Sequence, residues 1–171
     1  MPYRLIAKLE RAVEQFRSQV ANRHRLQRRS PKRLPKNKPL WDLPMMASSC
    51  CYADLQTGQF SKIYSDYSQQ AKSNSYDSFP ELRDRLLACA PPDDRRIGVR
   101  TSIPGCYNEV GRCAEPHAAR KCLKDLPRRI NQPIDSLLFS VAHTIKTGEP
   151  RNPCAICRAV FPQIRTFPHL R

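Results

Sequence analysis

Apolar residues recur at helical spacing along the first twenty positions of the chain. They are Leu5, Ile6, Leu9, Val13, Phe16 and Val20. Because residues three and four apart share one face of a helix, this pattern predicts an amphipathic helix over residues 3–20, with its other face basic. The following stretch, RRSPKRLPKNKPLWDLP (28–44), contains four prolines. Prolines disfavour helix and sheet, so we expect an extended linker there.

A composition change near residue 46 marks the expected domain boundary. Residues 1–46 would form the basic amphipathic helix and the proline-rich linker, and residues 47–171 a folded domain. That domain opens with CCYADLQTGQFSKIYSDY, which predicts two short strands around a turn at residues 56–58. The segment YDSFPELRDRLLACAPP predicts a helix that is capped by Ser78 and stopped by two prolines. Residues 90–112 are interpreted as a loop with one short extended piece at 97–103.

Three more elements are predicted in the C-terminal third of the chain. AEPHAARKCLKDL (114–126) is rich in helix formers, and IDSLLFSVAHTI (134–145) is typical of a buried strand. RNPCAICRAVF predicts a helix with Asn152 as its cap and Pro153 at its first position. QIRTFPHL supplies one further strand at most. The order strand, strand, helix, helix, strand, helix predicts a layered α/β domain.

Charge is distributed unevenly along the chain. The net charge is +15, and residues 1–40 hold 12 Lys and Arg against only Glu10 and Glu14. Such an arm attracts polyanions, and we expect it to contact nucleic-acid phosphates; a merely solvating tail is the alternative. The two acids argue against an organelle-targeting peptide. With no apolar window of about 18 residues, we expect a soluble protein, intracellular in the first place, with delivery as a secreted effector also compatible.

Eight cysteines raise the question of disulfides or metal. Disulfide frameworks belong to short secreted chains, so the metal interpretation is favoured. Cys154 and Cys157 form a C-x-x-C at a predicted helix start, which directs two sulfurs to one ion, and Cys113 is the candidate third ligand. Three protein ligands and a water are typical of catalytic zinc, whereas structural zinc has four protein ligands.

The stretch GRCAEPHAARKCL (111–123) adds an acid at Glu115. At a spacing of two residues, Glu115 and Cys113 make a poor ligand pair on a helix. In the first turn, however, a carboxylate can lie beside the metal-bound water. Zinc lowers the pKa of that water, and the carboxylate can move its proton to a leaving group.

Cys-Ala-Glu at 113–115, followed by Pro-Cys-Ala-Ile-Cys at 153–157, resembles the signature of the zinc-dependent cytidine deaminase superfamily. The longer strings GRCAEPHAA and TGEPRNPCAICRAVF are most similar to the toxin-type, YwqJ-like deaminases, over residues 48–165. The resemblance implies that Cys113, Cys154 and Cys157 bind Zn²⁺ and that Glu115 is the proton shuttle.

The same resemblance implies a fold and a reaction. The fold is a cytidine deaminase-like α/β/α layering with a mixed sheet, preceded here by the basic helical arm. Its C-terminal part is expected to be truncated, which leaves an edge for a partner strand or an oligomer. The reaction is hydrolytic deamination of cytosine, in preference to adenine, in nucleic acid or nucleotides.

Alternatives remain open at this stage. The scaffold is either catalytic or an inactive, zinc-stabilised interaction protein, and Cys154 with Cys157 also fits a thiol redox pair. Cys106 or Cys122 could close a structural zinc site.

Several further residues carry weaker expectations. Asn108 is a weak candidate for substrate binding, and an aromatic side chain that stacks on the base is expected in the pocket. His117 is expected to be a helix-facing or solvated histidine in preference to a ligand, and His143 a satisfied core histidine. The remaining expectations are for core or thiol roles: Cys50, Cys51, Cys89 and Cys122 as thiols, and Phe60, Tyr64, Phe139 and Phe161 as core.

Overall fold

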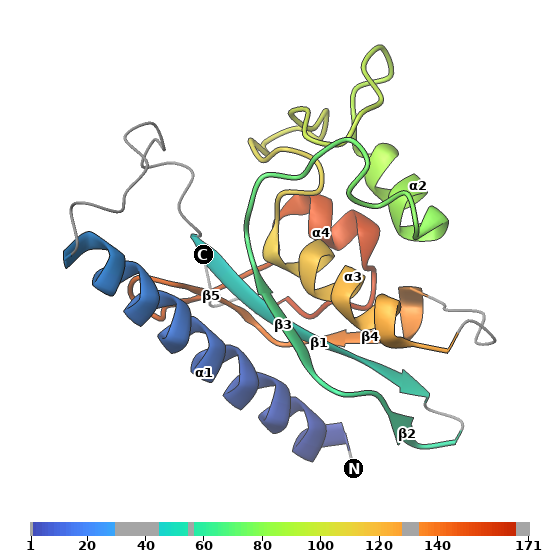
Figure 1. Cartoon of the computed structure of the whole chain (residues 1–171). Coiled ribbons are helices and arrows are strands. Elements are labelled where there is room, and N and C mark those ends of the chain that lie inside the picture. The colour runs from blue at the N-terminus through green and yellow to red at the C-terminus, as the bar shows by residue number, and fades with distance from the viewer. Residues whose placement is uncertain (1, 30–44, 55–56, 128–133, 167–171) are drawn as a thin grey trace.

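A computed structural model describes residues 2–29, 45–54, 57–127 and 134–166. Figure 1 shows one sheet between helices on its two faces. The elements are α1 (Pro2–Arg29), β1 (Met46–Asp54), β2 (Gln59–Phe60), β3 (Tyr64–Tyr67), α2 (Pro80–Leu87), α3 (Ala114–Asp125), a 3₁₀ turn (Ile134–Ser136), β4 (Leu137–Phe139), β5 (Ala142–Thr144), β6 (Pro150–Arg151) and α4 (Ala155–Val160). The predicted linker falls, from residue 30 on, outside the described residues.

Strand β1 lies at the centre of the sheet. It pairs with β2 and β3 on one side and with β4 and β5 on the other, and β6 extends the sheet from β5. The predicted hairpin is confirmed: Ala47 lies opposite Tyr67, and Ala53 opposite Phe60. Every strand pairing among the described residues is antiparallel. The expectation of a mixed sheet is therefore wrong for this part of the chain.

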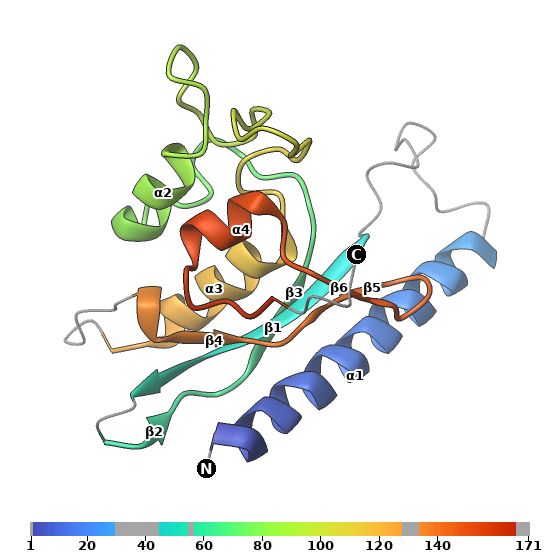
Figure 2. The same cartoon turned by 180° about the vertical axis from the view of Figure 1, so that it is seen from behind.

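Both faces of β1 are covered, which explains its nearly continuous burial. Successive side chains of a strand point to opposite faces. Accordingly, Cys51 packs with Leu5 and Leu9 of α1, whereas Cys50 belongs to the main core beneath α3 and α4. Figure 2, the view from behind, shows α1 alone on one face and the other helices on the opposite one. The layering is thus α/β/α.

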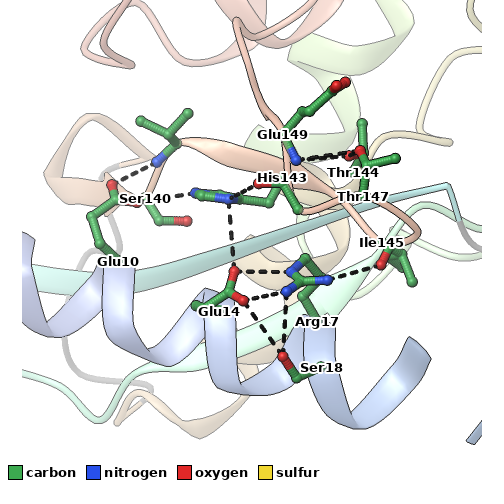
Figure 3. A network of polar contacts seen from close by, with 12 residues as sticks. Glu10, Glu14, Arg17, Ser18, Ser140, His143, Thr144, Ile145, Thr147 and Glu149 are labelled. Atoms are coloured by element: carbon green, nitrogen blue, oxygen red, sulfur yellow. Dashed lines mark hydrogen bonds and ion pairs between the residues drawn. The ribbon is translucent and has the colours of Figure 1, made fainter. Parts of the chain in front are cut away.

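Helix α1 is fixed to the sheet by polar contacts as well as by apolar ones (Figure 3). The Glu10 carboxylate accepts a hydrogen bond from the Val141 backbone N–H at 2.8 Å and lies 3.4 Å from His143 Nε2. Arg17 pairs with Glu14 and donates to the Ile145 carbonyl at 3.1 Å. Glu10 and Glu14 therefore lie on the flank of the helix that faces the β5–β6 turn.

The strand predicted over 134–145 is interrupted in its middle. At the break, the Ser140 hydroxyl accepts a hydrogen bond from the Ser49 N–H at 2.9 Å, and the next N–H, that of Val141, bonds to Glu10. The Ser140 N–H still bonds to the Ser49 carbonyl oxygen at 2.8 Å, so regular pairing with β1 is only partly lost at this position. The break separates β4 from β5.

Smaller expectations are corrected by the structure. Helix α2 is capped by Phe79 instead of Ser78, and α4 by Cys154 instead of Asn152. Phe60 is 45% exposed and does not belong to the core. Residues 162–166 form no strand. None of the helices in the described part of the chain is long and apolar enough to cross a bilayer.

Candidate metal and catalytic site

Three cysteine sulfurs converge where the first turns of α3 and α4 meet. Cys113 Sγ and Cys154 Sγ are 3.3 Å apart, and Cys154 Sγ and Cys157 Sγ are 3.7 Å apart. All three sulfurs lie within 4.8 Å of one another. The grouping predicted from the spacing of these residues is therefore present.

The sulfur triangle has the dimensions of a metal site. Two thiolates each about 2.3 Å from a tetrahedral zinc ion are separated by about 3.8 Å, close to the observed distances. A disulfide, by contrast, needs about 2.05 Å between sulfurs, and all eight cysteines are free thiols. Three cysteines close together can hold a metal ion, and thiolate ligands are suited to zinc among other soft or borderline ions.

Local sequence explains why these cysteines come together. Cys113 is the N-cap of α3 and Cys154 is the N-cap of α4, both in extended backbone conformation. Pro116 occupies the third position of α3, where no intrahelical N–H is required, and Pro153 directly precedes the α4 cap. The two helix starts thus place a sulfur at each entry, and Cys157 follows Cys154 by three residues on the same side.

The thiols of the cluster differ in acidity. Contact with the Cys113 and Cys157 sulfurs lowers the pKa of Cys154. Burial raises the pKa of Cys157, and the contact with Cys154 raises that of Cys113. Cys154 is therefore the first of the three to become a thiolate, the form that binds a metal.

Glu115 is a buried acid in contact with this cluster. Its side chain is 5% exposed, and its Oε2 accepts a hydrogen bond from the Cys157 thiol at 3.3 Å. Burial raises the pKa of Glu115 to about 7, and the negative charge of Cys154 acts in the same direction. A carboxyl group with that pKa can both accept and donate a proton near neutral pH.

A cavity of about 420 Å³ opens beside the cluster. This volume lies in the range of small-molecule sites. Its lining consists of Met45, Met46, Ser68, Asn108, Arg112, Cys113, Ala114, Glu115, Ala142, Thr144, Arg151, Asn152 and Cys154. A ligand in this cavity would therefore contact both the Glu115 carboxyl group and two of the three sulfurs.

Asn108 is where the sequence analysis expected a substrate-binding residue. Its side chain is exposed, lines the cavity, and donates from Nδ2 to Cys113 Sγ at 3.8 Å. The expected aromatic side chain is missing: among the described residues, none of the cavity lining is aromatic. Met45 and Met46 provide flexible apolar surface instead.

Other candidate residues lie apart from the sulfur cluster. Within the described chain, neither Cys106 nor Cys122 joins the three-sulfur group. Cys122 is buried further along α3, 3.5 Å from the Ser61 hydroxyl. His117 is buried rather than solvated, and its Nε2 lies 3.1 Å from the Gln69 carbonyl oxygen. His143 is satisfied by its neighbours, as expected.

Sequence reasoning missed most of the cavity wall. Arg112 and Asn152 stand next to the cysteine motifs, so their positions in the chain did offer a signal. Arg151 comes from the edge strand β6 and Thr144 from its neighbour β5. No local sequence pattern predicts that either residue lines a cavity. Met45 enters because β1 begins at the mouth of the cavity.

The fold and the site together define a mixed α/β protein with an open antiparallel sheet and a three-cysteine cluster beside a ligand-sized cavity. Comparison with protein-family models, with curated proteins and with solved structures gave no match.

Proposed function

We propose that the chain is a zinc-dependent hydrolytic deaminase of nucleobases, acting on cytosine in preference to adenine, in nucleic acid or in nucleotides. The observation that carries the proposal is the buried Glu115 carboxyl group, 3.3 Å from Cys157, at a cavity that Cys113 and Cys154 also line. Three cysteines, a separate glutamate and the Pro-Cys-x-x-Cys pattern are the parts that nucleobase deaminases combine.

Cys113, Cys154 and Cys157 would hold the zinc ion. Zinc bound by three protein ligands acts as a Lewis acid and lowers the pKa of water toward 7. Glu115 would take the proton of the attacking water and deliver it to the departing amine. The balanced reaction forms a C–O bond at the amidine carbon, breaks its exocyclic C–N bond and releases ammonia.

A second candidate function is a metal-stabilised interaction protein without turnover. The observation that favours it is the cavity wall, which lacks an aromatic side chain among the described residues. In that case the metal contributes folding free energy only. The two candidates differ in what Glu115 does, because a structural zinc site has no need of a separate acid.

The test combines metal analysis with an activity assay. Protein is purified under reducing conditions as wild type, as Cys154→Ser and as Cys106→Ser, a matched loss of a thiol outside the cluster. Zinc content and conversion of cytosine and adenine are measured on nucleosides, nucleotides and single-stranded DNA and RNA. One zinc per chain, lost with activity only in Cys154→Ser, is the expected result.

Other outcomes separate the alternatives. Zinc without conversion of any base would favour the interaction protein. A chain that binds no metal and forms a reversible Cys154–Cys157 disulfide would instead be a thiol redox protein.

A further inference from the structure

Two arginines line the cavity from parts of the chain far apart in sequence. Arg112 directly precedes Cys113 in the loop before α3, and Arg151 belongs to β6 at the edge of the sheet. Figure 2 shows that β6 leads into the segment before α4. Nothing in the chemistry of the sulfur cluster requires either guanidinium.

Each of these arginines forms an ion pair with a glutamate close to it in the chain. Arg112 Nη1 lies 3.1 Å from Glu109 Oε2, and Arg151 Nη2 lies 3.1 Å from Glu149 Oε2. The arginine side chains are 26% and 46% exposed. Ion pairs this accessible to water contribute little to stability. These two ion pairs therefore contribute little to holding either guanidinium in place.

The geometry of a guanidinium suits a phosphate in particular. It carries five N–H donors in a planar fork that matches phosphate oxygens, and it remains charged at all physiological pH values. A guanidinium can thus contact a carboxylate and a phosphate at the same time. Two such groups at one cavity would neutralise most of the charge of a phosphate ester.

The residues that line the cavity differ in how far they are exposed to water. Glu115 is 5% exposed, whereas the side chains of Arg112 and Arg151 are 26% and 46% exposed. The Glu115 carboxyl group is therefore more deeply buried than either guanidinium. Ala114 and Ala142 add apolar surface to the cavity wall. A ligand with a flat, weakly polar end and an anionic end would match this arrangement.

We infer that Arg112 and Arg151 form a phosphate-binding site at the mouth of the cavity. The ligand is accordingly a nucleotide, free or within a strand, and not a nucleoside or a free base. The identity of the base rests on the proposed function, but recognition of the phosphate does not depend on turnover. A free nucleotide and a nucleic-acid strand both present such a phosphate, and the experiment distinguishes them.

The experiment measures binding to the zinc-loaded full chain by calorimetry, with ribose 5-phosphate against ribose. Ribose 5-phosphate should bind more tightly. Hydrogen bonds to charged groups are worth about 1.5–3 kcal/mol. Arg112→Gln and Arg151→Gln should therefore each weaken the binding of ribose 5-phosphate by about tenfold or more, and the affinity for ribose should not change. Lys146→Gln removes an exposed charge from the neighbouring turn and serves as the matched control; it should leave both affinities unchanged.

A second arm identifies the source of the phosphate. Mononucleotides are compared with an oligonucleotide that carries only internal phosphodiesters. Arginine-dependent binding of the mononucleotide alone assigns a free nucleotide, and arginine-dependent binding of the oligonucleotide assigns a strand. Equal affinity for ribose and ribose 5-phosphate, or an equal loss in Lys146→Gln, would overturn the inference.

Failure of this inference is distinguishable from failure of the proposed function. Phosphate-dependent binding without deamination of any base would leave the site standing and overturn the enzymatic proposal. Deamination of nucleosides as efficient as that of nucleotides would support the enzymatic proposal and overturn the phosphate site.

Discussion

The Cys157 thiol donates a hydrogen bond to Glu115 across 3.3 Å, and this contact joins the first turn of α3 to α4. The Glu115 carboxyl group therefore contacts the cluster without belonging to the group of three sulfurs that could hold a metal. In the proposed deaminase, an acid placed in this way would move protons at the cavity. In a purely structural metal site, the burial of this carboxyl group would be unfavourable, and the metal would not need it.

Glu115→Gln separates these two possibilities. The amide keeps the size of the side chain but cannot exchange a proton near neutral pH, so zinc content should remain unchanged. Turnover should fall by about 10²–10⁴, the usual contribution of general acid–base catalysis. Glu81→Gln, on the first turn of α2, is the control. Unchanged turnover in Glu115→Gln would contradict the proton-shuttle role.

His143 should make stability decline as pH rises. The hydrogen bond to Glu10 raises the pKa of His143 above 6.5, and the Gly148 carbonyl at 3.1 Å acts in the same direction. The contribution is complete below the unfolded-state pKa of 6.5 and is lost as pH rises through the folded-state value. Urea unfolding of wild type and His143→Gln, from below to above pH 6.5, should show a shallower decline in the variant. Glu115, whose pKa is also raised, contributes a decline to both proteins.

His117 should produce the opposite slope. Burial lowers its pKa to about 4, against 6.5 in the unfolded chain. Its contribution to stability is present above pH 6.5 and is lost as pH falls toward 4. The variant His117→Gln should reduce the loss of stability on acidification, while the decline at higher pH, to which His143 and Glu115 contribute, persists. A variant that reduces both losses would show that the two histidines do not titrate independently.

Helix α1 should behave as part of the folded core. Leu9 is fully buried against Cys51 and Leu5. Leu9→Ala should therefore reduce the free energy of unfolding by about 2–5 kcal/mol. Gln19→Ala, at an exposed position of the same helix, should change it by less than about 0.5 kcal/mol. Equal, small effects in urea unfolding would mean that α1 is not docked on the sheet in solution.

The sequence predicted the site better than it predicted the sheet, for a physical reason. Cys154 and Cys157 are positioned by one turn of helix, and Cys113 by another helix start, so short patterns carry most of the information. The break between β4 and β5 depends on Glu10, which lies 131 residues from Val141. A contact between residues so far apart cannot be predicted from local secondary-structure propensity.

The same reasoning applies to α1 and to the cavity wall. The spacing of Leu5, Leu9 and Val13 predicted an amphipathic helix but gave no indication of the surface it covers. The helix continues to Arg29 because Arg, Gln and Leu are good helix formers. Arg151 reaches the cavity only through the pairing of β6 with β5. Which residues meet there is decided by strand pairing, not by sequence neighbours.

The positive charge of α1 gives the last prediction. Glu10 and Glu14 face the β5–β6 turn, whereas Arg4, Lys8 and Arg11 are exposed. At 100° per residue, these three basic residues share a separate flank of the helix. Among the described residues no acid pairs with them, so their charge remains available to a polyanion. Deleting the helix is a poor test of this role, because it would also remove buried leucines from the core.

Replacing only the three basic side chains avoids that difficulty. If the flank contacts the phosphates of single-stranded nucleic acid, the triple change to Gln should reduce the slope of log affinity against log salt concentration by about 2, from about 0.7 for each phosphate contact. Its control replaces Arg95, Lys124 and Arg158 by Gln, which removes equal charge from outside α1. Fluorescence anisotropy over a salt series measures both slopes. An equal reduction in the two variants would assign the binding to net charge alone and refute a specific surface on α1.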